Sequence, residues 1–224
     1  MFESNSVRIS GRSSKRRTPT KWGDREQRRI DILDAARARI ADRGYLSLNM
    51  RDLAAGAGIS PATLYSYFAT KEELFATLYA EAIRTHTETF LPVAEAGLDL
   101  TTLLSRVIEH YLELYRTYGQ HFTLWSAIRH DPGDGEVATF PRELIDELRA
   151  ATREHNRVQM EAIREAAGRE GRKVVDERLV PSFLWSVLNG LADHFTSERR
   201  ALDRFPAEQL ISFSAARLAL AITE

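Results

Sequence analysis

The sequence predicts an all-α protein, with an N-terminal helix-turn-helix domain followed by a larger helical domain. Apolar residues recur at helical spacing along most of its 224 residues, and no segment shows the period-two alternation of a strand bounded by turns. Residues 49–74 contain two helix starts joined by a glycine turn. A composition of 43% hydrophobic and 28% charged residues is ordinary for a globular protein that buries a sizeable core.

Composition excludes several classes of protein. No apolar run approaches the ~18 residues of a membrane helix, and the basic N-terminus lacks the apolar core of a signal peptide. We therefore expect a cytoplasmic protein. The absence of cysteine excludes disulfides, thiolate catalysis and most structural zinc sites.

Charge is segregated along the chain. Residues 1–71 carry 14 Lys and Arg against 7 Asp and Glu, a net charge of +7, while residues 72–224 carry 17 against 25, a net charge of −8. A basic module on an acidic body is typical of a nucleic-acid-binding protein, although a solvated surface is the plainer alternative.

Residues 1–23 are predicted to form a disordered basic arm, because they combine few apolar residues with six cations. This arm either lies along DNA phosphates or a minor groove, or is only a solubilising tail. Its cations are Arg8, Arg12, Lys15, Arg16, Arg17 and Lys21.

The helix-turn-helix domain is predicted to span residues 24–71. Asp24 and Gln27 can cap a first helix that ends near Gly44. Its apolar positions recur at helical spacing and comprise Ile30, Leu33, Ala36 and Ile40.

Asn49 is expected to cap the second helix, whose inward stripe is Met50, Leu53 and Ala54. Gly56 and Gly58 bracket the turn that follows, where glycine takes positive φ at low cost. Ser60 and Pro61 then provide an N-cap and a first-turn proline, so a third helix should begin there.

Leu64 and Phe68 are four residues apart and should face the core beside Ile59. The outer face is left with hydroxyl groups suited to phosphates and base edges, namely those of Thr63, Tyr65, Ser66 and Tyr67.

Thr70 and Glu73 form a capping box for a longer helix that runs to about Ala94, where Pro92 helps to end it. Lys71 lies at its start, where its ammonium and the helix N–H groups could bind one phosphate. Further helical patterns cover 99–117, 119–130, 141–168, 178–198 and 206–222.

These motifs closely resemble the DNA-binding domain of TetR-family transcriptional regulators. The resemblance spans residues 24 to about 75, through Gly44-Tyr45, Met50 to Ala54, Ala57 to Ser60, Thr63 to Phe68 and Thr70 to Leu74. The chain departs from the family pattern at Leu48, Pro61 and Ala62. The pattern and the resemblance together predict DNA contacts by Asn49, Ser60, Ala62, Thr63, Tyr65, Ser66, Tyr67 and Lys71.

The resemblance implies an all-α homodimer that binds a double-stranded DNA operator. It also implies that residues 72–224 hold a small-molecule ligand and the dimer face, and it implies no cofactor. Because pockets between helices are mostly apolar with a few polar groups, we expect a largely apolar ligand. Candidate lining residues are His110, Tyr111, Tyr115, Phe122, Trp125, Met160, Trp185 and Asn189, with packed core as the structural alternative.

The last two helices are the candidate dimer face, since small residues among larger apolar ones let helices approach closely. Packing of the same stripe within one chain is the alternative. The candidate interface residues are Gly190, His194, Leu210, Phe213, Arg217 and Leu220.

The sequence contains no motif typical of an enzyme active site. No His has a Glu three residues before it, and there is no phosphate-binding glycine loop or nucleophile elbow. We therefore expect no catalytic residue and no metal site. The sequence predicts a ligand-responsive regulator, most simply a repressor, and the alternative is a helix-turn-helix protein whose C-terminal domain binds a protein partner.

Overall fold

The computed structural model describes residues 25–119 and 140–224. Within these ranges every regular element is helical, and one isolated antiparallel bridge joins Val174 to Thr223. The elements are α1 (Arg25–Arg43), η1 (Tyr45–Ser47), α2 (Met50–Gly56), α3 (Pro61–Tyr65), α4 (Lys71–Ala94), α5 (Leu100–Tyr118), α7 (Arg142–Arg169), α8 (Val180–Thr196), η2 (Glu198–Leu202) and α9 (Ala207–Ile222). The all-α prediction is confirmed.

Local caps set the starts of the short helices. The side chain of Asn49 accepts hydrogen bonds from the backbone N–H groups of Arg51 and Asp52, at 2.8 and 3.3 Å. The hydroxyl of Ser60 accepts from the Thr63 N–H at 3.0 Å, with Pro61 in the first turn of α3. Both helix starts therefore lie where the sequence predicts them.

The two glycines of the turn play different roles. Gly58 has φ +68°, a conformation that other residues rarely adopt, as the sequence predicts. The expectation of positive φ is wrong for Gly56, which ends α2 in helical geometry. A Cβ at Gly56 would lie 3.2 Å from Nη2 of Arg39, so this glycine makes room for the α1 side chain.

Helix α4 begins with the predicted cap. Thr70 Oγ1 accepts from the Glu73 N–H at 3.0 Å, and the Glu73 carboxylate accepts from the Ala69 N–H at 2.8 Å. Pro92 lies in the last turn, and the helix ends at Ala94.

Two apolar cores share α4. The first joins α1, α2 and α3 to the N-terminal half of α4 and of α7, and contains Leu53, Leu64, Phe68 and Phe75. The departure at Leu48 contributes to this core, because its side chain is buried there. The second core begins at Phe90 and joins α5, α8 and α9 to the rest of α7. The helix-turn-helix domain is thus packed directly against the body of the chain, although residue 72 as its boundary stays a prediction.

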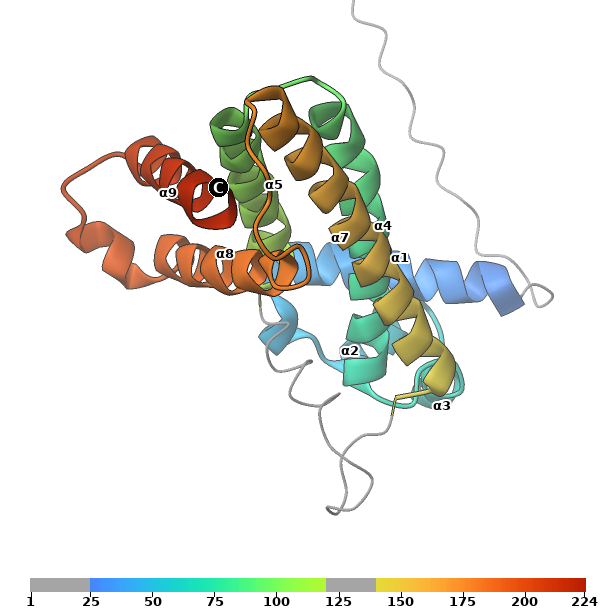
Figure 1. The fold of residues 1–224 in the computed structure, drawn as a ribbon. Coiled ribbons are helices and arrows are strands. Elements are labelled where there is room, and N and C mark those ends of the chain that lie inside the picture. The colour runs from blue at the N-terminus through green and yellow to red at the C-terminus, as the bar shows by residue number, and fades with distance from the viewer. Residues whose placement is uncertain (1–24, 120–139) are drawn as a thin grey trace, which may run out of the picture.

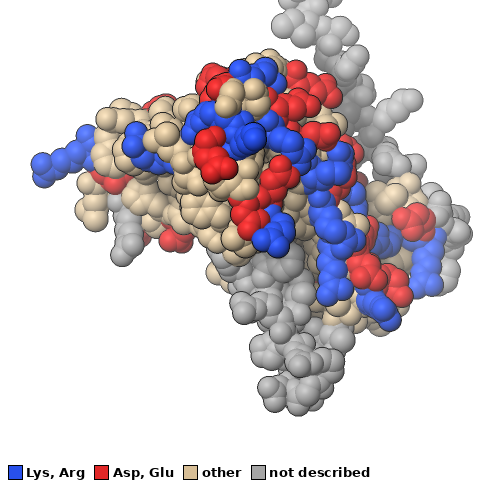
Figure 2. All heavy atoms as spheres, viewed as in Figure 1, with Lys and Arg blue, Asp and Glu red and all other residues tan. Residues whose placement is uncertain are grey.

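In the body of the molecule, α4 packs mainly against α7, and α5 packs mainly against α9 (Figure 1). Helices α8 and α9 extend away from α4 and α7, and η2 lies at their far end. Along the face covered by α7, Lys and Arg alternate with Asp and Glu (Figure 2). No helix in the described ranges is long and apolar enough to cross a membrane.

Two predictions fall outside the described residues. They are the basic arm over residues 1–23 and the helix over residues 119–130, of which only Gly119 belongs to the described part.

Candidate functional site

The outer face of α3 carries the predicted recognition residues. Tyr65 is 47% exposed, and Ala62 and Ser66 are also exposed. Thr63 and Tyr67 are half-buried. Leu64 and Phe68 are buried on the opposite side, so the sequence correctly predicts which side of α3 packs into the core.

Several predicted DNA contacts already have intramolecular partners. The hydroxyls of Ser60 and Thr63 lie 2.8 Å apart, and the Ser66 hydroxyl donates to the Thr63 carbonyl at 2.7 Å. Asn49 and Ser60 act as helix caps. A hydroxyl oxygen can still accept while it donates, so these bonds hold the side chains in place without exhausting their hydrogen-bonding capacity.

Lys71 is held at the first residue of α4. Its Nζ donates to the Leu46 carbonyl oxygen at 3.3 Å and lies 4.3 Å from the centre of the Tyr45 ring. Burial lowers the pKa of Lys71, against the raising effect of Glu72. Burial also raises the pKa of Tyr45, whose hydroxyl donates to Glu72 at 3.3 Å.

Three arginines near this surface are not among the residues that the sequence predicts to contact DNA. Arg51 is exposed in the first turn of α2, beside the Asn49 cap. The guanidinium of Arg25 lies 5.8 Å from the Tyr67 ring, and that of Arg29 lies 5.4 Å from the Phe68 ring. The excess of Lys and Arg in residues 1–71 indicates that this part of the chain binds an anion, but it does not identify which side chains lie at the surface of α3.

In the C-terminal body, three predicted ligand residues lie in one buried cluster, namely Tyr111, Tyr115 and Met160. Tyr111 donates to the amide oxygen of the buried Asn189 at 2.7 Å, and the amide nitrogen of Asn189 donates to the Trp185 carbonyl at 2.7 Å. Burial raises the pKa of Tyr111, chiefly because the phenolate would be desolvated. Trp185, in contrast, is 42% exposed on α8.

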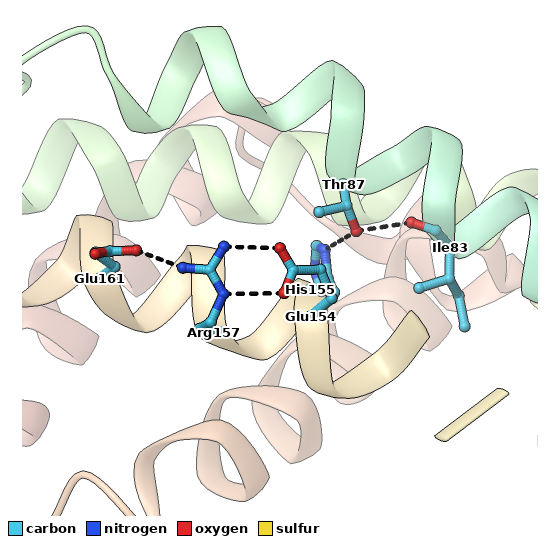
Figure 3. A network of polar contacts seen from close by, with 6 residues as sticks. All are labelled: Ile83, Thr87, Glu154, His155, Arg157 and Glu161. Carbon is cyan, nitrogen blue, oxygen red and sulfur yellow. Dashed lines mark hydrogen bonds and ion pairs between the residues drawn. The ribbon is translucent and has the colours of Figure 1, made fainter. Parts of the chain in front are cut away.

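His110 belongs to a histidine cluster that the sequence did not reveal. Its Nδ1 lies 3.0 Å from Nε2 of His86, and the His86 and His155 rings are 5.0 Å apart. The cluster joins α5, α4 and α7, and Figure 3 shows His155 of α7 pointing to Thr87 of α4, with 3.1 Å between Nδ1 and the hydroxyl oxygen. The available signal was a polar residue, His86, on the buried stripe of α4.

Burial dominates the electrostatics of this cluster. Burial and, to a smaller extent, the neighbouring histidines together lower the pKa of His86 to about 2 and that of His155 to about 4. Burial also lowers the pKa of His110, against the opposing effect of Glu113. All three imidazoles are therefore neutral at pH 7.

Phe122 and Trp125, the other two predicted ligand residues, lie outside the described residues. Ligand binding by the whole predicted set stays a prediction.

The predicted dimer face carries large exposed apolar side chains. Phe213 is 61% exposed and Leu220 is 58% exposed on α9, and Arg217 lies over the Phe213 ring at 5.5 Å. Leu210 is half-buried on the same helix, and Gly190 is exposed on α8. His194, also on α8, instead bonds Asp203 at 2.8 Å within the chain.

No group of three or more His, Cys, Asp or Glu side chains is arranged to hold a metal ion in the part of the chain that the structure describes.

Comparison with known proteins gives the class of the N-terminal domain. Residues 32–78 match the family model described as bacterial regulatory proteins, tetR family. The chain is 44% identical over 52 residues to the HTH-type transcriptional repressor KstR2 of Mycobacterium tuberculosis, covering 23% of this chain and 26% of that protein. It is 33% identical over 108 residues to the HTH-type transcriptional regulator EthR of the same species, covering 47% and 48% of the two chains.

Solved structures share the fold over most of the chain. The TetR-family regulator PfmR of Thermus thermophilus matches 84% of this chain and 96% of its own, with 21% identity and a TM-score of 0.58. FadR of Bacillus subtilis, solved in complex with stearoyl-CoA, matches 86% and 98%, with 18% identity and a TM-score of 0.56. At such identities the likeness shows the fold alone.

The α2–α3 pair and its glycine turn define a helix-turn-helix domain. Residues 32–78 of this domain match the tetR family of bacterial regulatory proteins, and the resemblance inferred from the sequence is confirmed. The chain spans about a quarter of KstR2 and about half of EthR in these matches.

Proposed function

We propose that this chain is a transcriptional repressor that binds an inverted-repeat DNA operator as a homodimer and is released by a small molecule. The observation that carries the proposal is the exposed outer face of α3, held by a core that continues directly into α4. The proposal places the protein with the chromosome, in the cytoplasm.

The shared core supports a coupling between ligand and DNA. Leu74 and Phe75 of α4 pack with the helix-turn-helix helices, and Phe90 of the same helix packs in the second core. A shift of α4 caused by a ligand in the second core would tilt α3. Such a ligand releases DNA only if it binds more tightly to the state that cannot engage DNA.

We further propose that the ligand is largely apolar. The apolar cluster around Tyr111, Tyr115 and Met160 supports this class, and Asn189 is the polar group within it. The stearoyl-CoA complex of FadR is consistent with it, since the two chains share a fold. If this cluster remains packed in the presence of all ligands, the C-terminal domain would instead bind a protein partner.

The dimer is supported by the apolar surface of α8 and α9. Two-fold symmetric helix-turn-helix proteins place their recognition helices in successive major grooves, about 34–36 Å apart. The exposed Phe213 and Leu220 are the kind of side chains that such an interface buries.

The test is selection of bound fragments from genomic DNA, followed by footprinting. We expect an inverted repeat with half-site centres about one helical turn apart, and loss of the footprint in Tyr65→Ala. Because Tyr65 is exposed, this variant should keep the wild-type melting temperature. A single asymmetric half-site bound by a monomer would contradict the proposal, as would an unchanged footprint in the variant.

A further inference from the structure

A groove of about 540 Å³ lies between α1, α4 and α5. This volume is in the range of small-molecule sites. None of the described residues predicted to bind the apolar ligand lines the groove, so it is a separate site from the Tyr111 cluster.

The cations of the groove are already neutralised. Arg37 pairs with Asp34 at 2.6 Å and with Glu81 at 2.7 Å, and Arg84 pairs with Glu147 at 2.9 Å. A bound anion would have to compete with these carboxylates.

Two carboxylates of the groove are left uncompensated. Glu88 of α4 and Glu113 of α5 both line the groove, both are exposed, and neither makes an ion pair within residues 25–119 and 140–224. The groove therefore presents an excess of negative charge from two different helices.

His86 adds a buried hydrogen-bond acceptor. His86 lines the groove although it is only 7% exposed. When the Thr89 hydroxyl donates to the Thr85 carbonyl, 2.9 Å away, its oxygen accepts from Nε2–H of His110 at 3.1 Å. The bare Nδ1 of His110 then accepts from Nε2–H of His86 at 3.0 Å.

This proton arrangement leaves Nδ1 of His86 with a lone pair and no donor among the described residues. Because burial lowers its pKa to about 2, His86 contributes no positive charge at pH 7. With these tautomers the unsatisfied polar atoms of the groove are acceptors, and the ligand that suits them is a donor with positive charge.

We propose that this groove binds a small organic polycation of the aliphatic polyamine class, with ammonium groups paired to Glu88 and Glu113 and His86 as a neutral acceptor. A bound polyamine would bridge α4 and α5 beside Arg37 of α1. Binding itself does not depend on the proposed repressor function, because it requires neither DNA nor the apolar ligand.

The test is isothermal titration of the full-length chain with spermidine at constant ionic strength and pH 7.5. We expect saturable binding with one site per chain. The double variant Glu88→Gln/Glu113→Gln should weaken binding at least tenfold, because both charge pairs are lost. Glu95→Gln/Glu143→Gln is the matched control, since it removes the same charge from exposed positions that do not line the groove.

Three outcomes would overturn the proposal. They are the absence of spermidine binding, equal weakening in the groove and control variants, and tighter binding of inorganic phosphate than of spermidine. Since Glu88 and Glu113 are exposed, both double variants should have the melting temperature of the wild type. A lower melting temperature in the groove variant alone would show that these carboxylates also stabilise the fold, and would count against the proposal. None of these results bears on operator binding, which is measured without spermidine.

Discussion

The ammonium of Lys71 lies against the ring of Tyr45, 4.3 Å from its centre, and donates to the neighbouring Leu46 carbonyl at 3.3 Å. An ammonium has three donors, so two remain for a phosphate at the start of α4. The contact spans 25 residues of sequence between the side chain and its acceptor, and it holds the cation at the start of α4.

Lys71→Ala should weaken operator binding across DNA sequences and reduce the slope of log K against log salt by about one unit, because one phosphate contact is lost. The measurement is a salt titration of DNA affinity by fluorescence anisotropy. Lys173→Ala is the control, since Lys173 is exposed between α7 and α8. An unchanged slope in Lys71→Ala would remove Lys71 from the interface.

Phe213→Glu and Leu220→Glu should each give a monomer, because a charge would replace an exposed apolar side chain at the proposed interface. Sedimentation measures the oligomeric state, and tight operator binding should be lost with the dimer. Ser212→Glu, at an exposed position about 100° around the same helix from Phe213, should leave the dimer intact. A wild-type chain that sediments as a monomer would contradict the assignment.

Tyr111→Phe should lower the free energy of unfolding by about 1–3 kcal/mol, since the buried Asn189 oxygen would lose its donor. Urea unfolding gives the value. The double variant Tyr111→Phe/Asn189→Leu should recover part of the loss, because both polar groups are then removed. A double variant no more stable than the single one would show that the hydrogen bond is not the source of the effect.

Stability should fall as pH decreases below about 6.5. The pKa values of His86 and His155 are lowered to about 2 and about 4 by burial, so the unfolded chain takes up protons first. The contribution of these histidines to the free energy of unfolding is complete above about pH 6.5, the pKa of a histidine in the unfolded chain. It is lost as the pH falls toward the pKa values of the folded state, at up to about 1.4 kcal/mol per group and pH unit.

Urea midpoints at pH 7.5 and 5.5 test this linkage. We expect the two histidines together to lower the free energy of unfolding by about 2–3 kcal/mol over that interval. In His86→Asn the difference between the two pH values should shrink by about 1.4 kcal/mol, because one titrating group is gone. Equal pH differences in the variant and the wild type would show that His86 does not titrate on unfolding.

Much of this protein could be predicted from sequence because the relevant contacts are local. The caps at Asn49, Ser60 and Thr70 act on backbone groups two or three residues away, so the residue types alone place the helix starts. The buried side of α3 likewise follows from Leu64 and Phe68, four residues apart. These regularities are enough to reveal the fold and its helix-turn-helix.

Which side chains meet across long stretches of sequence depends on how the helices pack. His86 contacts His110 across 24 residues, and Thr87 contacts His155 across 68. Gly56 makes room for Arg39 of another helix, and the uncompensated charge in the groove depends on which carboxylates Arg37 and Arg84 reach. Helical periodicity specifies the face on which a residue lies, whereas its partner depends on how the helices pack in three dimensions.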